Sequence, residues 1–485
     1  MAGIGFELRG LFKERGLFYN FKAYFVSSVV TSGPTLLCII LIIGMQVLLK
    51  NMGESFINIQ YFISIMIYCF AFSLIITGGF VLLAARYISD CIYRKTLGKI
   101  FPSFFGVTVI VLIIDFVLAN IFYLTSGIND FVKIYSIILL GEISIIWIES
   151  IYITTIKDYL SIFISFFIGI AVMFSVFLGL VYWIHIDNFF SALLSLVIGF
   201  LVMAILFAIK IYKVYGGTRF SVTDCFEIIT SIDEHPELLV TGVLYYLGMY
   251  VHNFVFWFSD KGMVIKDTFR IAPFYDVALF YAFLSIIPIT VIFVVKVETS
   301  FYPRYKEYYS LTQSNGSVKD IEIARSEMIT TLLIELRYLI EVQLFISFTF
   351  IAFGRKLLPM VGLSQLSTDI FSILILGSLC YIIMYFLLII LLYFDNKKNA
   401  MHIAITFFSL NLIFTLISLF LGESFYGYGF FAAAIISMVF AYFKLSYFLE
   451  EIDYYTFASQ PIFIKNKEGR FGKLYKYMLL KGRKI

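Results

Sequence analysis

Residues 103–125 read SFFGVTVIVLIIDFVLANIFYLT and hold a single charged side chain, Asp115. A run of about 18 or more apolar residues is long enough to cross the hydrocarbon layer of a membrane as a helix. Strands of a membrane barrel would instead alternate apolar and polar residues over about 10 positions. The run therefore predicts a transmembrane α-helix that carries one carboxylate near its centre.

The whole chain has the same character as this stretch. Of its 485 residues, 61% are hydrophobic and 14% are charged, and the mean hydropathy is +0.95. A soluble domain carries about 25% charged residues, so no water-facing surface accounts for this composition. We predict an all-α membrane protein with twelve transmembrane helices. The other eleven spans are expected near residues 23–49, 59–84, 131–156, 161–184, 188–210, 237–258, 272–296, 338–354, 369–393, 400–421 and 426–448.

The basic residues predict the orientation of these spans. Cytoplasmic loops of inner-membrane proteins carry an excess of Lys and Arg. With the N-terminus inside, 29 of the 36 basic residues fall in cytoplasmic segments and 7 fall outside. We therefore predict a multi-pass protein of the cytoplasmic membrane with both termini in the cytoplasm. The net charge of +4 reflects this topology and gives no reason to expect nucleic acid as a partner.

A polar stretch between the sixth and seventh spans divides the chain into two halves. Six spans on each side predict a two-lobed transporter with related halves. Five divisions follow: an amphipathic interfacial segment (1–22), a first six-helix lobe (23–210), a cytoplasmic linker (211–236), a second six-helix lobe with the cytoplasmic loop 297–337 (237–448), and a basic cytoplasmic tail (449–485) that can contact anionic lipid.

Ionisable residues inside the spans are the candidates for function, because each costs several kcal/mol unless it is paired or hydrated. Asp115 lies near the middle of the third span, and Glu142 lies near the middle of the fourth. Glu149 follows Glu142 by seven residues and so shares its helix face, roughly 10 Å along the axis. The three carboxylates can line a polar cavity that binds substrate hydroxyls or exchanges protons. The alternative is that each is a structural carboxylate, either bonded to a neighbouring Ser, Thr or Tyr or lying toward an interface.

Polar residues of the second predicted lobe extend this candidate site. His252 and Asn253 lie in the seventh span and can offer hydrogen bonds to a sugar or a lipid headgroup, although residues near Trp257 also commonly anchor a span at the interface. Asp276 begins the eighth span, at the predicted outer rim.

Several motifs of other protein classes are missing from the sequence. It contains no GxxxxGK[ST] motif for ATP and no DxD triplet of the kind that many glycosyltransferases use for a nucleotide-sugar and its metal. The five cysteines show no CxxC spacing and the four histidines no paired spacing, so no metal site is expected. We predict a transporter without a cofactor, and not an enzyme.

Five short stretches, in order along most of the chain, resemble the PelG family, the polytopic membrane components of Pel exopolysaccharide systems. One departure is that His252-Asn253 stands where an Asp-Lys pair is expected, which puts the role of that position in doubt. The stretches are Met1-Ala2-Gly3-Ile4-Gly5-Phe6-Glu7-Leu8-Arg9, Ser32-Gly33-Pro34, Tyr246-Leu247-Gly248 with Phe256-Trp257, Val297-Glu298-Thr299-Ser300-Phe301, and Tyr305-Lys306-Glu307-Tyr308-Tyr309.

This resemblance implies a flippase-like fold of the multidrug/oligosaccharidyl-lipid/polysaccharide superfamily. It also implies export of an N-acetylgalactosamine-rich polysaccharide, together with a cytosolic glycosyltransferase of the PelF type and membrane partners of the PelD and PelE types. The loop 297–337 suits docking of such a partner, although packing against the bundle explains it equally well. The candidate docking residues are Glu298, Arg304, Tyr305, Tyr308 and Tyr309.

Two alternatives to polysaccharide export stay open on the sequence. One is a membrane scaffold that recruits and activates the glycosyltransferase while translocation takes place elsewhere. The other is a flippase for a lipid-linked oligosaccharide or an exporter of drugs, which shares the architecture and needs no synthase partner.

Overall fold

The computed structural model describes residues 17–156, 158–217, 222–313, 316–458 and 469–482. Within these residues, 12 helices are long and apolar enough to cross a membrane, which confirms the predicted number of spans. The predicted interfacial segment, residues 1–22, lies outside the described residues except for its last six positions, where helix α2 begins.

Contacts divide the chain into two compact units, which we describe separately. The N-terminal unit comprises residues 34–272 and 463–485, and the C-terminal unit comprises residues 1–33 and 273–462. The boundary passes through α2 (Leu17–Asn51) at its internal Pro34. This division places the seventh span with the first six, whereas the sequence groups it with the later ones. The predicted lobes 23–210 and 237–448 therefore stay a prediction.

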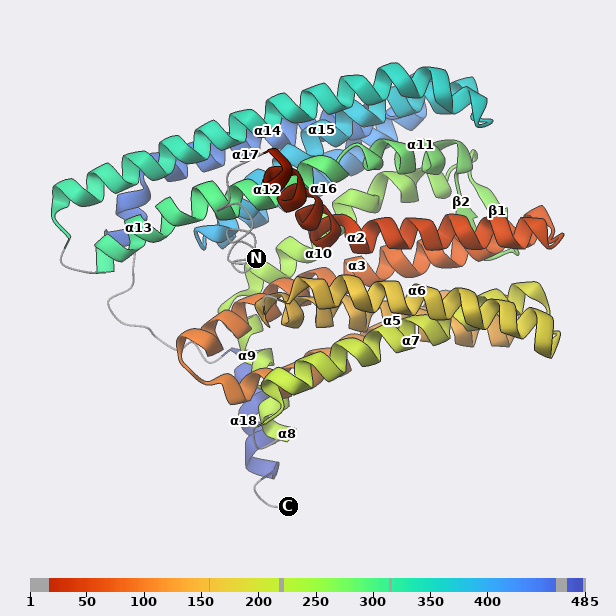
Figure 1. The fold of residues 1–485 in the computed structure, drawn as a ribbon, viewed down its shortest axis with the longest axis horizontal. Coiled ribbons are helices and arrows are strands. Elements are labelled where there is room, and N and C mark those ends of the chain that lie inside the picture. Colours follow the sequence, from red (N-terminus) through yellow and green to blue (C-terminus); the bar gives the residue numbers. More distant parts are fainter. Residues whose placement is uncertain (1–16, 157, 218–221, 314–315, 459–468, 483–485) are drawn as a thin grey trace. The chain divides into compact units, whose positions relative to one another are not determined.

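The N-terminal unit is a helical bundle in which α3 and α5 form the centre. Helix α5 packs against α3, α4 and α7, and α6 packs along α7 (Figure 1). In chain order the elements are α3 (Phe56–Tyr93), η1 (Leu97–Lys99), α4 (Ile100–Tyr123), α5 (Asp130–Ile156), α6 (Tyr159–Gly179), the π-helical turn η2 (Leu180–Ile184), α7 (Asn188–Tyr215), α8 (Val222–Cys225), η3 (Glu227–Ile229), α9 (Thr230–Glu234), α10 (Pro236–Trp257), β1 (Met263–Ile265), β2 (Phe269–Ile271) and α18 (Arg470–Gly482).

Glycines explain why α10 packs with the first spans. A Cβ atom on Gly242 of α10 would lie 2.2 Å from the carbonyl oxygen of Gly78 on α3, and a Cβ on Gly78 would lie 2.8 Å from the carbonyl oxygen of Gly242. Only residues without a side chain allow two helix backbones to come this close, a device common in membrane helices. The pair therefore fixes α10 against α3.

A β-hairpin follows α10 and covers one end of the N-terminal unit. Strands β1 and β2 pair in antiparallel fashion, with Ile265 opposite Phe269. The Tyr68 hydroxyl of α3 donates to the Arg270 carbonyl at 2.9 Å and accepts from the Arg270 N–H at 3.0 Å. Phe269 is fully buried and meets the Tyr68 ring edge-on, with ring centroids 5.1 Å apart. The hairpin is thus fastened to the bundle by hydrogen bonds and by aromatic packing.

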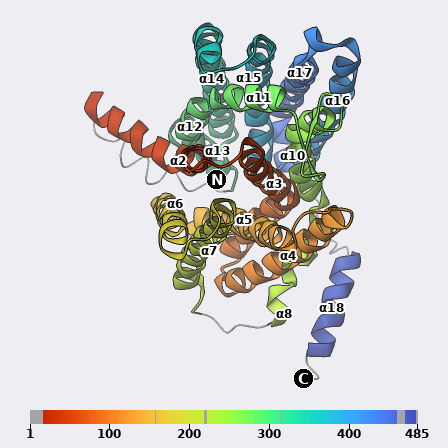
Figure 2. The ribbon, with the colours of Figure 1, turned by 90° about the vertical axis from the view of Figure 1, so that its right-hand side faces the viewer.

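The other end of the N-terminal unit carries the linker and the end of the chain. Helix α18 lies beside α8 and contacts α9 (Figure 2). The Asp233 carboxylate accepts a hydrogen bond of 2.7 Å from the Gly472 N–H. Because this N–H lies in the first turn of α18, it has no acceptor inside its own helix, and Asp233 fills that role. The predicted basic tail is therefore tied to the predicted linker.

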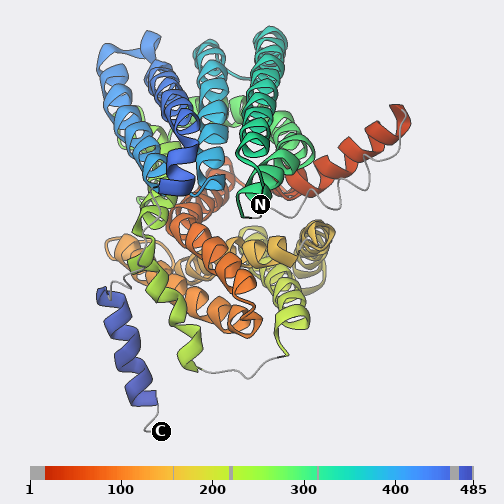
Figure 3. The same ribbon diagram turned by 90° about the vertical axis from the view of Figure 1, so that its left-hand side faces the viewer.

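The C-terminal unit holds the remaining spans, with α15 packed against α11, α14 and α17 (Figure 3). The elements are α11 (Pro273–Leu284), α12 (Ile287–Lys296), the π-helical turn η4 (Val297–Phe301), α13 (Tyr302–Gln313), α14 (Val318–Met360), α15 (Gln365–Tyr393), α16 (Lys397–Leu421), η5 (Glu423–Phe425), α17 (Tyr428–Glu450) and the π-helical turn η6 (Tyr454–Ala458).

The eighth and ninth spans differ from simple transmembrane helices. The eighth is broken between α11 and α12, where Pro288 lies in the first turn of α12 and has no N–H to continue the ladder. Helix α14 has 43 residues and is therefore about 65 Å long, roughly twice the thickness of the hydrocarbon layer. The segment 297–337, predicted as a loop, is thus largely helical: α13 and the first half of α14 form a hairpin.

We expect the hairpin β1–β2 and the hairpin α13–α14 to face opposite sides of the membrane, because the basic residues predict this topology. Asp260→Cys and Lys319→Cys place a thiol on an exposed residue near each hairpin. The native cysteines give little background, since four are buried and Cys38 is half-buried. In spheroplasts, whose cytoplasmic membrane is intact and accessible, a membrane-impermeant maleimide should label the Asp260→Cys variant and not the Lys319→Cys variant. The reverse pattern would invert the topology.

Candidate transport site

Asp115 is the most isolated of the predicted site residues. It lies in the middle of α4, and its side chain is 1% exposed. Neither carboxylate oxygen has a hydrogen-bond partner in the part of the chain that the structure describes. The buried hydroxyl of Ser144 on α5 faces this carboxylate without reaching hydrogen-bond geometry. Whether Ser144 holds Asp115, as the structural alternative expects, stays a prediction.

Glu142 and Glu149 belong to α5, and both are buried, with 6% and 1% exposed. The seven-residue spacing places them two turns apart on one face of the helix, about 10 Å along its axis. One oxygen of each, Oε2, is buried without a partner among the described residues. An anion in such a place is expensive, so each of these groups is suited to hold a proton or to meet a polar ligand or cation.

The three carboxylates do not contact one another through hydrogen bonds or ion pairs within the described residues. A cavity of about 270 Å³ lies among α3, α4 and α5, and its lining is mainly apolar, with Ala119, Leu140 and Phe72 among its walls. Asp115 and Glu142 are not among the residues that line this cavity. A shared polar cavity for the trio stays a prediction.

The other predicted substrate residues fall in both units. His252 and Asn253 of α10 are 0% and 5% exposed, and they belong to the N-terminal unit together with the carboxylates. The sequence places them in the second lobe. Asp276 is half-buried in the first turn of α11 and belongs to the C-terminal unit.

The residues predicted to dock a partner make contacts inside the C-terminal unit. Tyr308 is fully buried, and its hydroxyl donates to Asp453 at 3.0 Å. The buried Glu298 accepts from the Tyr393 hydroxyl at 3.3 Å. The Tyr308 contact fastens the hairpin α13–α14 to the bundle, and the Glu298 contact fastens the preceding turn η4. Such packing is the alternative that the sequence left open.

The other three docking candidates show the same pattern. The Tyr305 hydroxyl donates to the Tyr393 carbonyl at 3.3 Å. Arg304 is exposed but forms ion pairs with Glu307 at 3.0 Å and with Glu327 of α14 at 2.7 Å. Tyr309 is half-buried, and its ring centroid lies 4.6 Å from that of Tyr305. A direct role of these five residues in partner binding stays a prediction.

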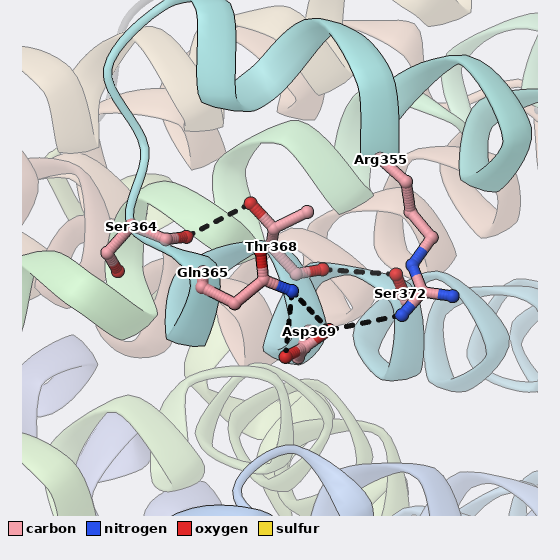
Figure 4. Close-up of polar contacts among 6 residues, drawn as sticks. All are labelled: Arg355, Ser364, Gln365, Thr368, Asp369 and Ser372. Carbon is pink, nitrogen blue, oxygen red and sulfur yellow. Dashed lines mark hydrogen bonds and ion pairs between the residues drawn. The ribbon is translucent and has the colours of Figure 1, made fainter.

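A polar cluster that the sequence analysis did not identify lies where α14 turns into α15 (Figure 4). Arg355 pairs with Asp369 at 3.1 Å, and the Gln365 amide donates to both oxygens of the same carboxylate at 3.3 Å. Both charged side chains are about half exposed. An exposed pair contributes little to stability, about 0–1 kcal/mol, so this cluster is a polar surface feature of the C-terminal unit.

Comparison with known protein families identifies the family of this chain. Residues 1–457 match the family described as "PelG: Putative exopolysaccharide Exporter (EPS-E)". The chain belongs to the PelG family. No curated protein matches the sequence.

Solved structures show that the PelG-family chain has the fold of MATE transporters, which belong to the MOP superfamily. A point mutant of the MATE transporter VcmN from Vibrio cholerae is 14% identical, with a TM-score of 0.61, and the match covers 88% of this chain and 96% of VcmN. The bent form of VcmN gives 12% identity, a TM-score of 0.61, and coverage of 89% and 97%. A MOP-superfamily transporter from Pyrococcus furiosus is 12% identical, with a TM-score of 0.59, and the match covers 88% of this chain and 96% of that transporter. The fold is therefore flippase-like, as predicted. The 12 candidate membrane helices and the exporter family make the chain a multi-pass membrane transporter.

The unpartnered state of Asp115 leads to a prediction about stability. Asp115→Asn removes the charge of a buried carboxylate whose oxygens make no hydrogen bond within the described residues, so the apparent melting temperature of the purified protein should stay equal or rise. Trp147→Phe is the comparison, because it removes a hydrogen bond of 3.1 Å from Nε1 to Ser73 Oγ and should lower stability by about 1 kcal/mol. A clear fall in melting temperature for Asp115→Asn would mean that the carboxylate has a stabilising partner.

Proposed function

We propose that this protein carries an N-acetylgalactosamine-rich exopolysaccharide across the cytoplasmic membrane, with both termini in the cytoplasm. The match of residues 1–457 to an exopolysaccharide exporter family is the observation that carries this proposal. The fold supports a transport function, because the solved structures that share it are transporters. A neutral polymer also suits the task, since each positive charge moved outward would cost about 2.3 kcal/mol per 100 mV.

The buried carboxylates of the N-terminal unit supply polar groups along the proposed path. Asp115, Glu142 and Glu149 lie within the membrane-spanning parts of α4 and α5. Ionisable residues at such depth are rare and are typical of substrate pathways and proton relays. We therefore assign them to contact with sugar hydroxyls or to proton exchange during transport, with His252 and Asn253 as hydrogen-bonding groups of the same unit.

The proposed partners are a cytosolic glycosyltransferase of the PelF type and membrane proteins of the PelD and PelE types. The hairpin α13–α14 supports this assignment, because α14 is far longer than the hydrocarbon layer is thick and the hairpin must extend beyond it. Its own tyrosines are used for internal packing. The docking surface would therefore be formed by the exposed side chains of the hairpin, such as Lys306 and Ile323.

Export should depend on the buried carboxylates and not on an exposed one. We expect Asp115→Leu and Glu142→Leu to abolish secretion of the polymer while the protein stays in the membrane at its normal level, because only the polar group is lost. Asp260→Leu, which changes an exposed residue between α10 and β1, should secrete normally. The measurement is polymer outside the cells, with membrane content determined by immunoblotting. Full secretion by both buried variants would count against the path.

Partner binding should depend on the exposed face of the hairpin α13–α14. From detergent-solubilised membranes, the tagged chain should co-purify with a cytosolic glycosyltransferase of the PelF type. Lys306→Glu reverses an exposed charge in the predicted docking segment and should reduce the recovered glycosyltransferase several-fold. Lys356→Glu makes the same change on an exposed residue at the other end of α14 and is the matched control. Equal recovery with both variants would remove Lys306 and its surroundings from the docking surface.

A further inference from the structure

A polar pocket of about 370 Å³ lies in the N-terminal unit, at the end covered by the β1–β2 hairpin. Four separate segments of the chain contribute to it: the start of α3, the turn between α4 and α5, the turn between η2 and α7, and the turn between β1 and β2. The predicted topology places all four on the outside. The carboxylates Asp115, Glu142 and Glu149 do not line it, so it is distinct from the site described above.

The pocket has an aromatic wall that is itself well ordered by packing. The rings of Tyr61 and Phe189 stack, with centroids 5.0 Å apart and planes at 12°, and each residue is 5% exposed. Phe190 meets Phe189 edge-on, with centroids 5.7 Å apart. Because Tyr61 and Phe189 are buried against each other, the half-buried Phe190 is the ring of this wall that offers apolar surface to a sugar ring.

One polar atom in this wall points to a ligand. The Tyr61 hydroxyl is buried and has no hydrogen-bond partner among the described residues. A buried hydroxyl without a partner costs free energy, and most buried polar groups in proteins are paired. Because Tyr61 lines the pocket, a ligand seated there can supply the missing partner. A phenolic O–H both donates and accepts, which matches the hydroxyl groups of a sugar.

The rim of the pocket is polar, and its charged side chains form no ion pairs within the described residues. Asp187, Lys266 and Asp267 are exposed, and none of them forms an ion pair or a side-chain hydrogen bond within the described residues. Lys266 and Asp267 both have positive φ, 49° and 54°, which is uncommon for residues other than glycine and costs energy. Two carboxylates and one ammonium group give the rim one net negative charge, which disfavours acidic ligands.

We propose that this pocket binds one or two sugar rings of the exported polysaccharide, neutral or amino-bearing and not acidic. The volume is at the small end of the roughly 300–1,000 Å³ that small-molecule sites occupy, so it suits a short segment. Aromatic stacking, a buried hydroxyl and a rim of unpaired polar groups together supply what a sugar ring requires. At the predicted outer end, such a site would hold the polymer after it has crossed the membrane. The inference rests on the proposed function for the identity of the sugar.

Tyr61→Phe tests the pocket with the loss of a single oxygen atom. The full-length protein in detergent would be titrated with the methyl glycosides of N-acetylgalactosamine, galactosamine and galacturonic acid at millimolar concentrations, with ligand-observed NMR as the readout. We expect the wild type to bind the first two more tightly than the acid. Tyr61→Phe should weaken binding about threefold to tenfold, which is the range for one neutral hydrogen bond.

Tyr93→Phe is the matched control, because it makes the same change on an exposed residue at the opposite end of the same helix. It should bind like the wild type, and Asp187→Asn should reduce the discrimination against the acid. Equal binding by wild type and Tyr61→Phe would overturn the proposal, as would tighter binding of the acid or no binding of any glycoside. These binding results are independent of secretion. A protein that secretes polymer but fails here refutes only the pocket, and one that binds here but never secretes refutes the exporter.

Discussion

Hydrocarbon offers no hydrogen bonds, and this constraint shapes every level of the structure. Backbone groups inside a membrane must be satisfied within their own segment, so the apolar runs become helices. The same constraint makes each buried carboxylate costly. Both oxygens of Asp115 and one oxygen each of Glu142 and Glu149 are nevertheless buried inside α4 and α5 without hydrogen-bond partners among the described residues. A role of these carboxylates in transport stays a proposal.

The same constraint explains which parts of the fold the sequence could predict. Hydropathy located all twelve spans, because each must present an apolar surface to lipid. Hydropathy does not report helices outside the membrane. The extension of α14 far beyond its apolar part was therefore not predicted, and the segment predicted as a loop is largely helical. The hairpin β1–β2 has strands of only three residues each, too short for a recognisable alternation. The break before α12 does have a visible cause in the sequence, because Pro288 has no N–H to continue the helix.

The candidate sites were predictable in part, for a similar reason. A carboxylate inside a long apolar run, such as Asp115, stands out from the sequence alone. Which side chains surround it depends on packing, and the hydroxyl that faces it, on Ser144, carries no sequence pattern. The tyrosines of α13 resembled a docking surface, yet Tyr308 is buried against Asp453. The polar pocket beside the β1–β2 hairpin could not be predicted, because its wall and rim come from four distant segments that only the fold brings together.

The central claim is that the polymer passes through this protein and is not merely made beside it. The most direct measurement reconstitutes the chain with its glycosyltransferase and membrane partners in sealed liposomes. The nucleotide-sugar is supplied outside the liposomes, to proteins whose cytoplasmic face points outward. Our account predicts that the wild type accumulates polymer in the lumen, protected from an added glycosidase, and that Glu142→Leu does not, although synthesis continues. Polymer that is made in full but stays accessible to the glycosidase with the wild type would contradict the account and favour a scaffold.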